Sequence, residues 1–550
     1  MNTNKRFVTF FWGMSAKKSF LLLIASAFVF ALPFVTKNVS GEVPLVKLCG
    51  VFGWCGLVPL FVTVFDTQKT LKRVLYSLFC FFFVFYFFVY SWFINLYPLD
   101  FAGLGNIESI GVIIIAETAI PFLHGIVMTL CVFLGYASAK QINNVFLKSI
   151  LVSAGYVLGE YMQSVGTFAF PWARLFVGQT ENVALLQSAS LFGSYFITFI
   201  MVLVNSFLAF SLMNVQTNKK KCRNFALVAT GIFLVNFTFG VLRINFADLS
   251  DCKKLSAVVL QGNIPSGEKW SGEVDEKEVY LQLSEYALAH PMAKEFDADI
   301  AVMPETAFPV TLITDDKYKS QHEKVLFEIS QKLDAELFVG AFNDEGGKSY
   351  NSIFVFSPDG SVTKPYNKHN IVPFGEFLPY RGIIEKIAPS LAEMNMFTSE
   401  ISRGESFEPI QTKAGKAACL VCFDSIFPET ARKQIKGGGE FIVISTNDSW
   451  YKTSSAIYQH ADHAIMRAIE NNVPVIRSAN TGVSKIIDNF GRVDSETKVN
   501  ERTAIGESVY IPESMTLYTK TGDLVVPICG IMIFAFLLYG ICAKKKASRN

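Results

Sequence analysis

The sequence predicts a membrane protein with two parts, a bundle of eight transmembrane helices and a large α/β domain. Composition is the first indication: of 550 residues, 51% are hydrophobic and only 17% are charged, which is too apolar for an ordinary soluble protein. The second is the distribution of apolar stretches long enough to cross a bilayer, because seven lie before residue 245 and one lies after residue 524. The third is a β-α alternation in the segment between them.

The eight predicted spans are residues 19–35, 43–65, 74–97, 110–136, 145–165, 190–213, 225–244 and 525–543. The fourth contains Pro121, so a kink is expected there. A signal peptide would also begin with basic residues and an apolar core, but no small-x-small cleavage site follows and further spans come directly after it. The predicted domains are therefore residues 1–244 with seven helices, 245–524 with the α/β domain, and 525–550 with the eighth helix and a basic tail.

Basic residues fall on alternate loops of this arrangement. One set of loops and the tail carry Lys5, Arg6, Lys17, Lys18, Lys69, Lys72, Arg73, Lys140, Lys148, Lys219, Lys220, Lys221, Arg223, Lys544, Lys545, Lys546 and Arg549. The other short loops carry only Lys37, Lys47 and Arg174. By the positive-inside rule, both termini are expected in the cytoplasm and residues 245–524 on the opposite side of the membrane.

Short β-rich runs alternate with amphipathic helical stretches in the large domain. Strands are predicted at 255–263, 299–306, 336–343, 352–360, 416–424, 440–448, 473–480 and 483–491, and helices at 275–290, 318–334, 427–437 and 455–472. Polar residues gather where strands end, in "PET", "FND", "CFDS", "TNDSW" and "SANTG". Such residues can simply cap strands and turns, but in α/β folds the carboxyl ends of strands also hold the functional site.

The stretch "ACLVCFD" holds Cys419 and Cys422 at the end of one predicted strand. Side chains alternate along a strand, so the two sulfurs should point to opposite faces and should not form a disulfide. A redox pair would instead need a helix start, and a zinc site would have only His460 and His463 as further ligands. Cys419 is expected to be a buried apolar residue, and Cys422 to be the cysteine that can meet a substrate.

A cysteine nucleophile needs a base and a group that stabilises negative charge. Among the histidines, only His369 has a suggestive sequence setting. Glu305 in "MPETAFP" and Lys368 in "YNKHNIVPFGEF" are better candidates. The carboxylate can take the thiol proton, while the ammonium stabilises the thiolate and the oxyanion formed on attack.

These residues match a known pattern. Glu305, Lys368 and Cys422 resemble the Glu-Lys-Cys triad of the nitrilase, or carbon-nitrogen hydrolase, superfamily. Together with the spans on both sides, the motifs "LQGNIPSGEKW", "MPETAFP", "YNKHNIVPFGEF", "TNDSWY" and "IMRAIENNVPVIRSANTGVS" resemble the apolipoprotein N-acyltransferase family over the whole chain.

The resemblance implies an αββα sandwich joined to eight helices. It also implies transfer of an acyl chain from a membrane phospholipid, through a Cys thioester, to the N-terminal amine of the diacylglyceryl-cysteine of a lipoprotein. The location implied is the bacterial inner membrane, with a periplasmic catalytic domain. No cofactor or metal is implied, and a net charge of +2 gives no sign of a nucleic-acid partner.

The resemblance also suggests residues that meet the substrate. Glu376 matches a second carboxylate of the family, and Trp270 matches an aromatic residue implicated in substrate engagement. Trp450 is expected in the same pocket, with core packing as the alternative.

The chain departs from the family after the nucleophile, where Phe423 and Asp424 replace the usual Tyr and Glu. We expect both to contribute to substrate binding. For Asp424 the alternative is a cap on the helix beginning near Phe427.

Two other functions use part of the same evidence. A membrane-tethered amidase or nitrilase would share the triad and use water as acceptor. A transporter with an outward receptor domain would need polar residues within its spans, where the sequence has chiefly Glu117, His124, Glu160 and Asn205.

Overall fold

A computed structural model describes residues 16–39, 44–66, 70–99, 103–289, 297–312, 320–387 and 400–547. The predicted basic residues Lys5, Arg6, Lys69 and Arg549 lie outside these ranges. The chain divides into two compact units. We call them the helical unit (residues 1–94, 113–246 and 523–550) and the sandwich unit (residues 95–112 and 247–522). The predicted domain 245–524 thus differs from the sandwich unit, which also includes the segment 95–112.

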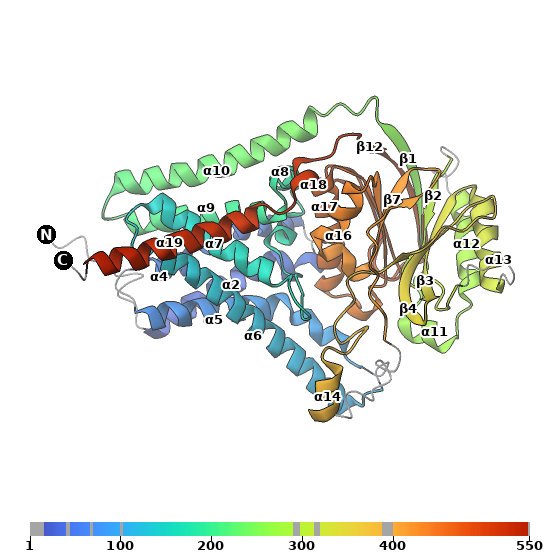
Figure 1. The fold of residues 1–550 in the computed structure, drawn as a ribbon, viewed down its shortest axis with the longest axis horizontal. Helices are drawn as coiled ribbons and strands as arrows, with labels where there is room; N and C mark the ends of the chain where they lie inside the picture. Colours follow the sequence, from blue (N-terminus) through green and yellow to red (C-terminus); the bar gives the residue numbers. More distant parts are fainter. Residues whose placement is uncertain are drawn as a thin grey trace. The chain divides into compact units, whose positions relative to one another are not determined.

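The described residues of the helical unit form α-helices and short 3-10 helices (Figure 1). Its α-helices are α2 (Ala16–Val35), α3 (Phe52–Cys55), α4 (Val58–Val64), α5 (Leu71–Val89), α6 (Asn106–Ala139), α7 (Val145–Met162), α8 (Ala189–Phe192), α9 (Ser194–Asn214), α10 (Lys219–Asn245) and α19 (Val525–Ala547). Short 3-10 helices are η1 (Lys37–Val39), η2 (Pro44–Val51), η3 (Ser91–Leu96), η5 (Leu175–Gln179) and η6 (Val183–Leu186).

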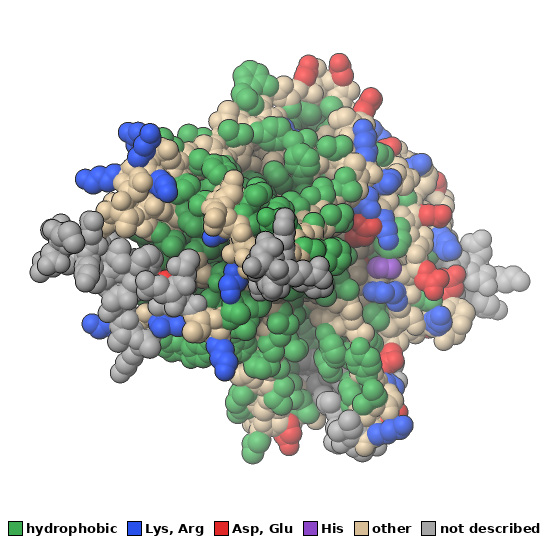
Figure 2. Space-filling view, turned by 60° about the vertical axis from the view of Figure 1, so that its left-hand side comes forward, with side chains coloured by type: hydrophobic (Ala, Val, Ile, Leu, Met, Phe, Trp, Pro, Cys, Tyr) green, Lys and Arg blue, Asp and Glu red, His purple; other side chains and the backbone are tan. Residues whose placement is uncertain are grey.

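Among the described residues, eight helical segments are long and apolar enough to cross a membrane, and they coincide with the eight predicted spans. The second of them is built from three short pieces, η2, α3 and α4. Helix α6 is one continuous element that contains Pro121. Large hydrophobic side chains such as Ile115, Val235 and Phe534 are exposed on these helices, and hydrophobic side chains cover much of the helical surface seen in Figure 2.

Small residues let two of the spans approach closely. A side chain at Gly135 of α6 would place its Cβ 2.3 Å from the carbonyl oxygen of Leu151 in α7. A side chain at Gly155 of α7 would place its Cβ 2.5 Å from the carbonyl oxygen of Cys131 in α6. The two glycines therefore permit backbone contact between α6 and α7, as small residues commonly do in membrane helices.

The sandwich unit contains two six-stranded sheets. The first has the order β12-β1-β2-β3-β4-β5 and the second β11-β10-β9-β8-β7-β6. Their strands are β1 (Lys253–Gln261), β2 (Ile300–Val302), β3 (Glu336–Glu345), β4 (Lys348–Phe356), β5 (Tyr366–Asn367), β6 (Ile410–Gln411), β7 (Lys416–Val421), β8 (Phe441–Thr446), β9 (Val475–Ala479), β10 (Lys485–Ile487), β11 (Val493–Glu496) and β12 (Thr503–Ile511). Strands β1, β2 and β3 are parallel, as are β7, β8 and β9.

Helices α12 (Glu276–Ala289) and α13 (Gln321–Leu333) cover the outer face of the first sheet, and α16 (Pro428–Lys436) and α17 (Ser455–Asn471) cover that of the second. The unit also contains α11 (Ser266–Ser271), α14 (Arg381–Ile387) and α18 (Leu517–Thr521), with the 3-10 helices η9 (Cys422–Ile426) and η10 (Ser449–Tyr451). Figure 1 shows α12 and α13 on one side of the paired sheets and α16 and α17 on the other.

A buried core joins the inner faces of the two sheets. Val259, Val302 and Phe338 of the first sheet belong to the same hydrophobic cluster as Cys419 and Val443 of the second. A second cluster packs the first sheet against α12 and α13. The layers are therefore helix, sheet, sheet and helix, which confirms the predicted αββα sandwich.

Candidate active site

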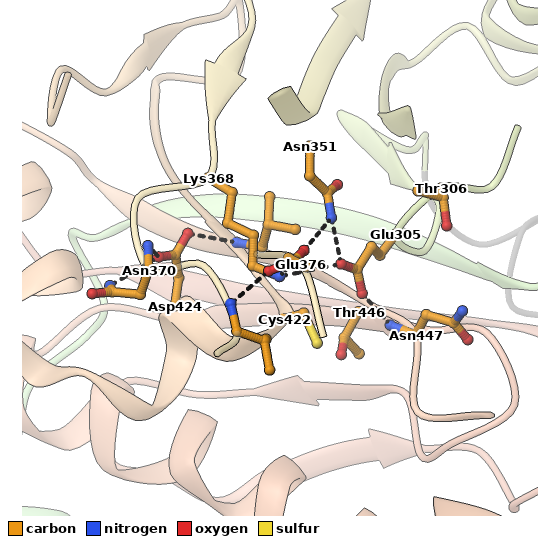
Figure 3. Close-up of polar contacts among 12 residues, drawn as sticks. Glu305, Thr306, Asn351, Lys368, Asn370, Glu376, Cys422, Asp424, Thr446 and Asn447 are labelled. Atoms are coloured by element: carbon orange, nitrogen blue, oxygen red, sulfur yellow. Dashed lines mark hydrogen bonds and ion pairs between the residues drawn. The ribbon is translucent and has the colours of Figure 1, made fainter. Parts of the chain in front are cut away.

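Glu305 lies just after β2, where the chain turns at the carboxyl end of the parallel strands (Figure 3). Its Oε1 accepts a hydrogen bond from Asn351 Nδ2 at 2.7 Å, and its Oε2 accepts one from the main-chain N–H of Asn447 at 2.8 Å. Gly340 on β3 makes room for this turn, because a Cβ there would lie 2.6 Å from the Cα of Glu305. The carboxylate is thus held by a side chain of β4 and by the main chain just after β8.

Lys368 follows β5 and is almost fully buried between two carboxylates. Its Nζ lies 2.8 Å from Glu376 Oε1 and 3.5 Å from Glu305 Oε1. Glu376 is held in turn by the main-chain N–H of Val372, 2.8 Å from its Oε2. Burial acts to lower the pKa of Lys368, but Glu376 and Glu305 outweigh it and hold that pKa above the usual lysine value. The ammonium therefore stays charged at neutral pH.

Cys422 is the first residue after β7 and begins η9. Its φ of 49° lies in the left-handed region, which is uncommon for a residue with a side chain and typical of strained functional turns. The side chain is partly exposed, whereas Cys419 is fully buried in the core between the sheets. Both cysteines are free.

Cys419 is thus buried and Cys422 accessible, as predicted. The predicted reason, that the two side chains alternate along one strand, is wrong. Strand β7 ends at Val421, so alternation along the strand does not reach Cys422. The sharp turn after the strand, and not the pleat, separates the two sulfurs.

Burial raises the pKa of the Cys422 thiol, and the negative charge of Glu305 raises it further, against a lowering by Lys368. The free site thus keeps the sulfur protonated at neutral pH, so a base must take the proton as the sulfur attacks. Glu305, Lys368 and Cys422 converge at one edge of the sandwich (Figure 3), which suits acyl transfer through a covalent intermediate.

Asp424 is fully buried and hydrogen-bonds to the segments that carry the active-site residues. Its carboxylate accepts hydrogen bonds from Tyr366 Oη at 2.9 Å and from the main-chain N–H and Nδ2 of Asn370 at 2.7 and 2.9 Å. It also accepts one from the main-chain N–H of Val421 at 3.2 Å. Asp424 thus ties the segment that carries Lys368 to the turn that carries Cys422.

This placement does not support one of the sequence-based expectations. Helix α16 begins at Pro428 with Phe427 as its N-cap and no side-chain capping bond, so the alternative of Asp424 as a cap is wrong. Phe423 is also buried, with its ring 5.3 Å from that of Phe427; a direct role of Phe423 and Asp424 in substrate binding stays a prediction. The histidine with a suggestive sequence setting, His369, contacts the main chain in this structure: its Nδ1 lies 2.8 Å from the carbonyl oxygen of Gly404.

The two predicted tryptophans are both accessible. Trp270, on α11, is 48% exposed, and its ring centroid lies 6.2 Å from that of Phe342. Trp450, on η10, is partly exposed, which does not fit the alternative of core packing. Both can therefore offer apolar surface to a ligand.

Comparison with known proteins identifies the family. The sequence model of the carbon-nitrogen hydrolase family matches residues 257–509, and that of the apolipoprotein N-acyltransferase N-terminal domain matches residues 44–207. The chain is 31% identical over 391 residues to the apolipoprotein N-acyltransferase of Geobacter metallireducens, covering 69% of this chain and 72% of that one. This chain belongs to the apolipoprotein N-acyltransferase family.

A second relative and a solved structure were also found. The apolipoprotein N-acyltransferase of Gloeobacter violaceus is 27% identical over 505 residues, covering 91% of this chain and 92% of that one. The crystal structure of Saccharomyces cerevisiae Nit3, a member of branch 10 of the nitrilase superfamily, matches 50% of this chain and 96% of its own with 17% identity and a TM-score of 0.36. By its family, the chain is a membrane-bound acyltransferase for the N-acylation of lipoproteins.

This acyltransferase also has residues around Glu305 that the sequence did not single out. Lys269, beside Trp270, is buried, and its Nζ donates to Thr306 Oγ1 at 2.7 Å and to the carbonyl oxygen of Glu305 at 3.2 Å. Burial lowers the pKa of Lys269 to about 8, although Glu305 and Glu276 act against the shift. Its position inside "GEKW" was the only signal, and a lone lysine in a motif does not indicate burial.

Proposed function

We propose that Cys422 carries the acyl group as a thioester, taken from a membrane phospholipid and passed to the N-terminal amine of a diacylglyceryl-cysteine lipoprotein. The observation that carries the proposal is the convergence of three groups that follow the ends of β2, β5 and β7. They are the Glu305 carboxylate, the charged Lys368 ammonium and the protonated Cys422 thiol. One membrane-spanning helix would be enough to tether the catalytic domain. The presence of eight such helices is consistent with a donor and an acceptor that both carry lipid chains and lie in the membrane.

In the first step, Glu305 takes the proton of the Cys422 thiol as the sulfur attacks the ester carbonyl of the donor. Lys368 stabilises the negative charge that develops on the sulfur and on the carbonyl oxygen. The C–O bond then breaks, and Glu305 returns the proton to the leaving glycerol oxygen. The products are a thioester on Cys422 and a lysophospholipid.

In the second step, the acceptor amine attacks the thioester carbonyl and Glu305 takes a proton from the nitrogen. The C–S bond breaks, the amide is complete, and the proton returns to the Cys422 sulfur. Ester, thioester and amide follow one another without an external energy source, because the amide is the most stable of the three. Glu376 holds Lys368 in place, and Trp270 and Trp450 offer apolar contact to the lipid.

The test uses the purified full-length protein in detergent with a labelled phospholipid. Wild type should show an acyl adduct on the peptide containing Cys422 by mass spectrometry, and a diacylated peptide should discharge it as an amide. Cys422→Ala should lose the adduct, and the matched control Cys419→Ala should keep it. An adduct on Cys419, or discharge to water at the same rate without peptide, would contradict the proposal; the second result would indicate a hydrolase.

We further propose that the sandwich unit faces the periplasm of a bacterial inner membrane and that both termini face the cytoplasm. The distribution of lysine and arginine between alternate loops supports this orientation. Alkaline phosphatase fused after residue 250 should be active, and a fusion at the C-terminus should be inactive. The reverse pattern would overturn the orientation without affecting the chemistry.

A further inference from the structure

A buried polar network lies directly behind the nucleophile and takes no part in the mechanism described above. Its centre is Asp448, fully buried after β8. Arg477 Nη2 donates to Asp448 Oδ2 at 2.7 Å, and His460 Nδ1 lies 2.8 Å from Asp448 Oδ1. Burial acts to raise the pKa of Asp448, but Arg477 and His460 outweigh it and keep that pKa below the usual value. The carboxylate is therefore ionised and can only accept, so His460 Nδ1 carries a hydrogen.

The other side of the His460 ring reaches the turn that presents the sulfur. His460 Nε2 lies 3.2 Å from the carbonyl oxygen of Cys422 and 3.2 Å from Ser425 Oγ. Ser425 Oγ is itself 2.7 Å from that carbonyl oxygen. The three atoms form a closed triangle. The turn at Cys422 has a positive φ, a conformation that persists only where surrounding contacts impose it.

Asp448 also reaches the sulfur through a second residue. Thr446, the buried last residue of β8, donates its hydroxyl to Asp448 Oδ1 at 3.2 Å. Thr446 lies within hydrogen-bonding reach of the Cys422 thiol and acts to lower its pKa, and Figure 3 draws the two side chains in the same part of the site. A thiol can donate to the Thr446 oxygen while the Thr446 hydroxyl donates to Asp448. When the sulfur becomes a thiolate, the single hydroxyl hydrogen can turn from Asp448 to the sulfur, because Arg477 and His460 still donate to Asp448.

We propose that Thr446 is a further catalytic residue, which stabilises the Cys422 sulfur as it loses its proton, and that His460 is a positioning residue, which holds the Cys422 turn through the Ser425 hydroxyl, since Nε2 can accept from Ser425 Oγ. Asp448, anchored by Arg477, orients both. This inference rests on the proposed role of Cys422 as the nucleophile.

The first test measures the sulfur directly, without acyl transfer. Iodoacetamide labelling of the Cys422 peptide in the full-length protein, followed by mass spectrometry across pH, reports thiolate formation. The charged or titratable groups that face this thiol are Glu305 after β2, Lys368 after β5, and Asp448 and Tyr451 after β8, with His460 of α17 behind it. Thr446→Val removes the hydroxyl and keeps the shape, whereas Thr446→Ser keeps the hydroxyl.

Thr446→Val should shift the labelling curve to higher pH by about one unit or more and lower single-turnover acylation about ten- to a hundredfold, as expected for one hydrogen bond to a charged group. Thr446→Ser should restore both. A Thr446→Val protein with the wild-type labelling curve and wild-type acylation would overturn the role of Thr446.

His460→Leu should lower acylation about tenfold, and His460→Gln, whose amide can offer an oxygen acceptor to Ser425 in place of Nε2, should recover part of the loss. His463→Gln, a change of another buried histidine on the same helix, is the matched control and should leave the labelling curve unchanged. Equal acylation by His460→Leu and wild type would overturn the positioning role.

The experiments distinguish a variant that does not fold from a failure of the proposal, and a failure of the proposal from a failure of the proposed function. If His460→Leu does not fold, the Thr446 pair decides the proposal, because its members differ from threonine by single heavy atoms. If Cys422→Ala still acquires an acyl group, the proposed function fails, yet the labelling curves still show whether Thr446 controls the Cys422 sulfur.

Discussion

Two of the buried charge clusters among the described residues, one in each unit, are built differently. In the helical unit, one cation faces one carboxylate: Arg174 Nε donates to Glu160 Oε2 at 2.9 Å, and both side chains are almost fully buried. Thr198 Oγ1 and the main-chain N–H of Leu175 complete the carboxylate, and the guanidinium lies 3.7 Å from the ring centroid of Tyr195. In the sandwich unit, one ammonium faces two carboxylates and a thiol.

The difference lies in the charge balance. In the matched pair of the helical unit, Arg174 and Glu160 carry one charge each in direct contact, and Glu160 also holds the main chain at Leu175, after α7. In the unmatched set around Lys368, burial and the negative charge of Glu305 together keep the Cys422 sulfur protonated, and the same carboxylate is able to accept that proton. The contrast indicates that imbalance, and not burial alone, marks the chemical site.

Breaking the matched pair should produce the largest loss of stability. Arg174→Met leaves Glu160 buried without its cation, and this should lower the free energy of unfolding by about 3–5 kcal/mol. Thermal unfolding in detergent measures it, with iodoacetamide labelling of Cys422 in the folded fraction as the activity control. The double variant Arg174→Met/Glu160→Leu should recover much of the loss. A melting temperature equal to that of wild type would show that the pair contributes nothing.

Breaking the unmatched set should instead reduce activity. Lys368→Met removes the charge that stabilises the oxyanion, so single-turnover acylation should fall by on the order of 10²–10³. Its effect on stability should be smaller than that of Arg174→Met, because Glu305 and Glu376 retain donors from Asn351 and Val372 and one of them can bind a proton. Acylation near the wild-type rate would make Lys368 a structural residue.

Lys269 tests the same contrast by pH, since it is a buried cation whose charge burial disfavours. Its folded-state pKa of about 8 lies below the 10.5 of an ordinary lysine, so the unfolded chain binds the proton more tightly. The free energy of unfolding of wild type, relative to Lys269→Met, should therefore rise as pH increases from about 8 to about 10.5, by on the order of 3 kcal/mol. Parallel stability curves for the two proteins would show that Lys269 is not desolvated.

Asp424 should give the smallest effect, and one of mixed kind. Asp424→Asn replaces an acceptor-only group that faces several donors, so both stability and acylation should fall, the former by about 1–3 kcal/mol. Phe423→Tyr should lower acylation less. Thermal unfolding and single-turnover acylation are measured on the same samples. Lost acylation with full stability would place Asp424 among the groups that act on the substrate.

The parts of the fold that depend on local pattern were predictable. The eight spans agree with the helices because length and hydropathy alone define them, and β3 and α17 begin at the predicted residues because periodicity and a turn mark their starts. The C-terminal limits were less accurate: β2 ends at Val302 and β7 at Val421, each before the polar residues that the prediction included. Those polar residues lie in the turns after the two strands, and these turns carry Glu305 and Cys422.

Features that depend on tertiary contact were not predictable. Strand β12 was missed, although it pairs with β1 along nine residues, because Gly506, Glu507 and Ser508 interrupt its apolar sequence. The triad could be named because its residue types suggest their chemistry. The network of Asp448, His460 and Thr446 could not, because only the fold brings α17 behind the turn after β7.

The pairing of β1 with β12 also has a mechanical consequence. The ladder is antiparallel and begins at Lys253 opposite Ile511, so the chain enters and leaves the sandwich unit at neighbouring positions. A pull on both connections would load the ladder from that end, one pair at a time. It would also strain the core between the sheets, because Leu255 of β1 and Val509 of β12 belong to that core.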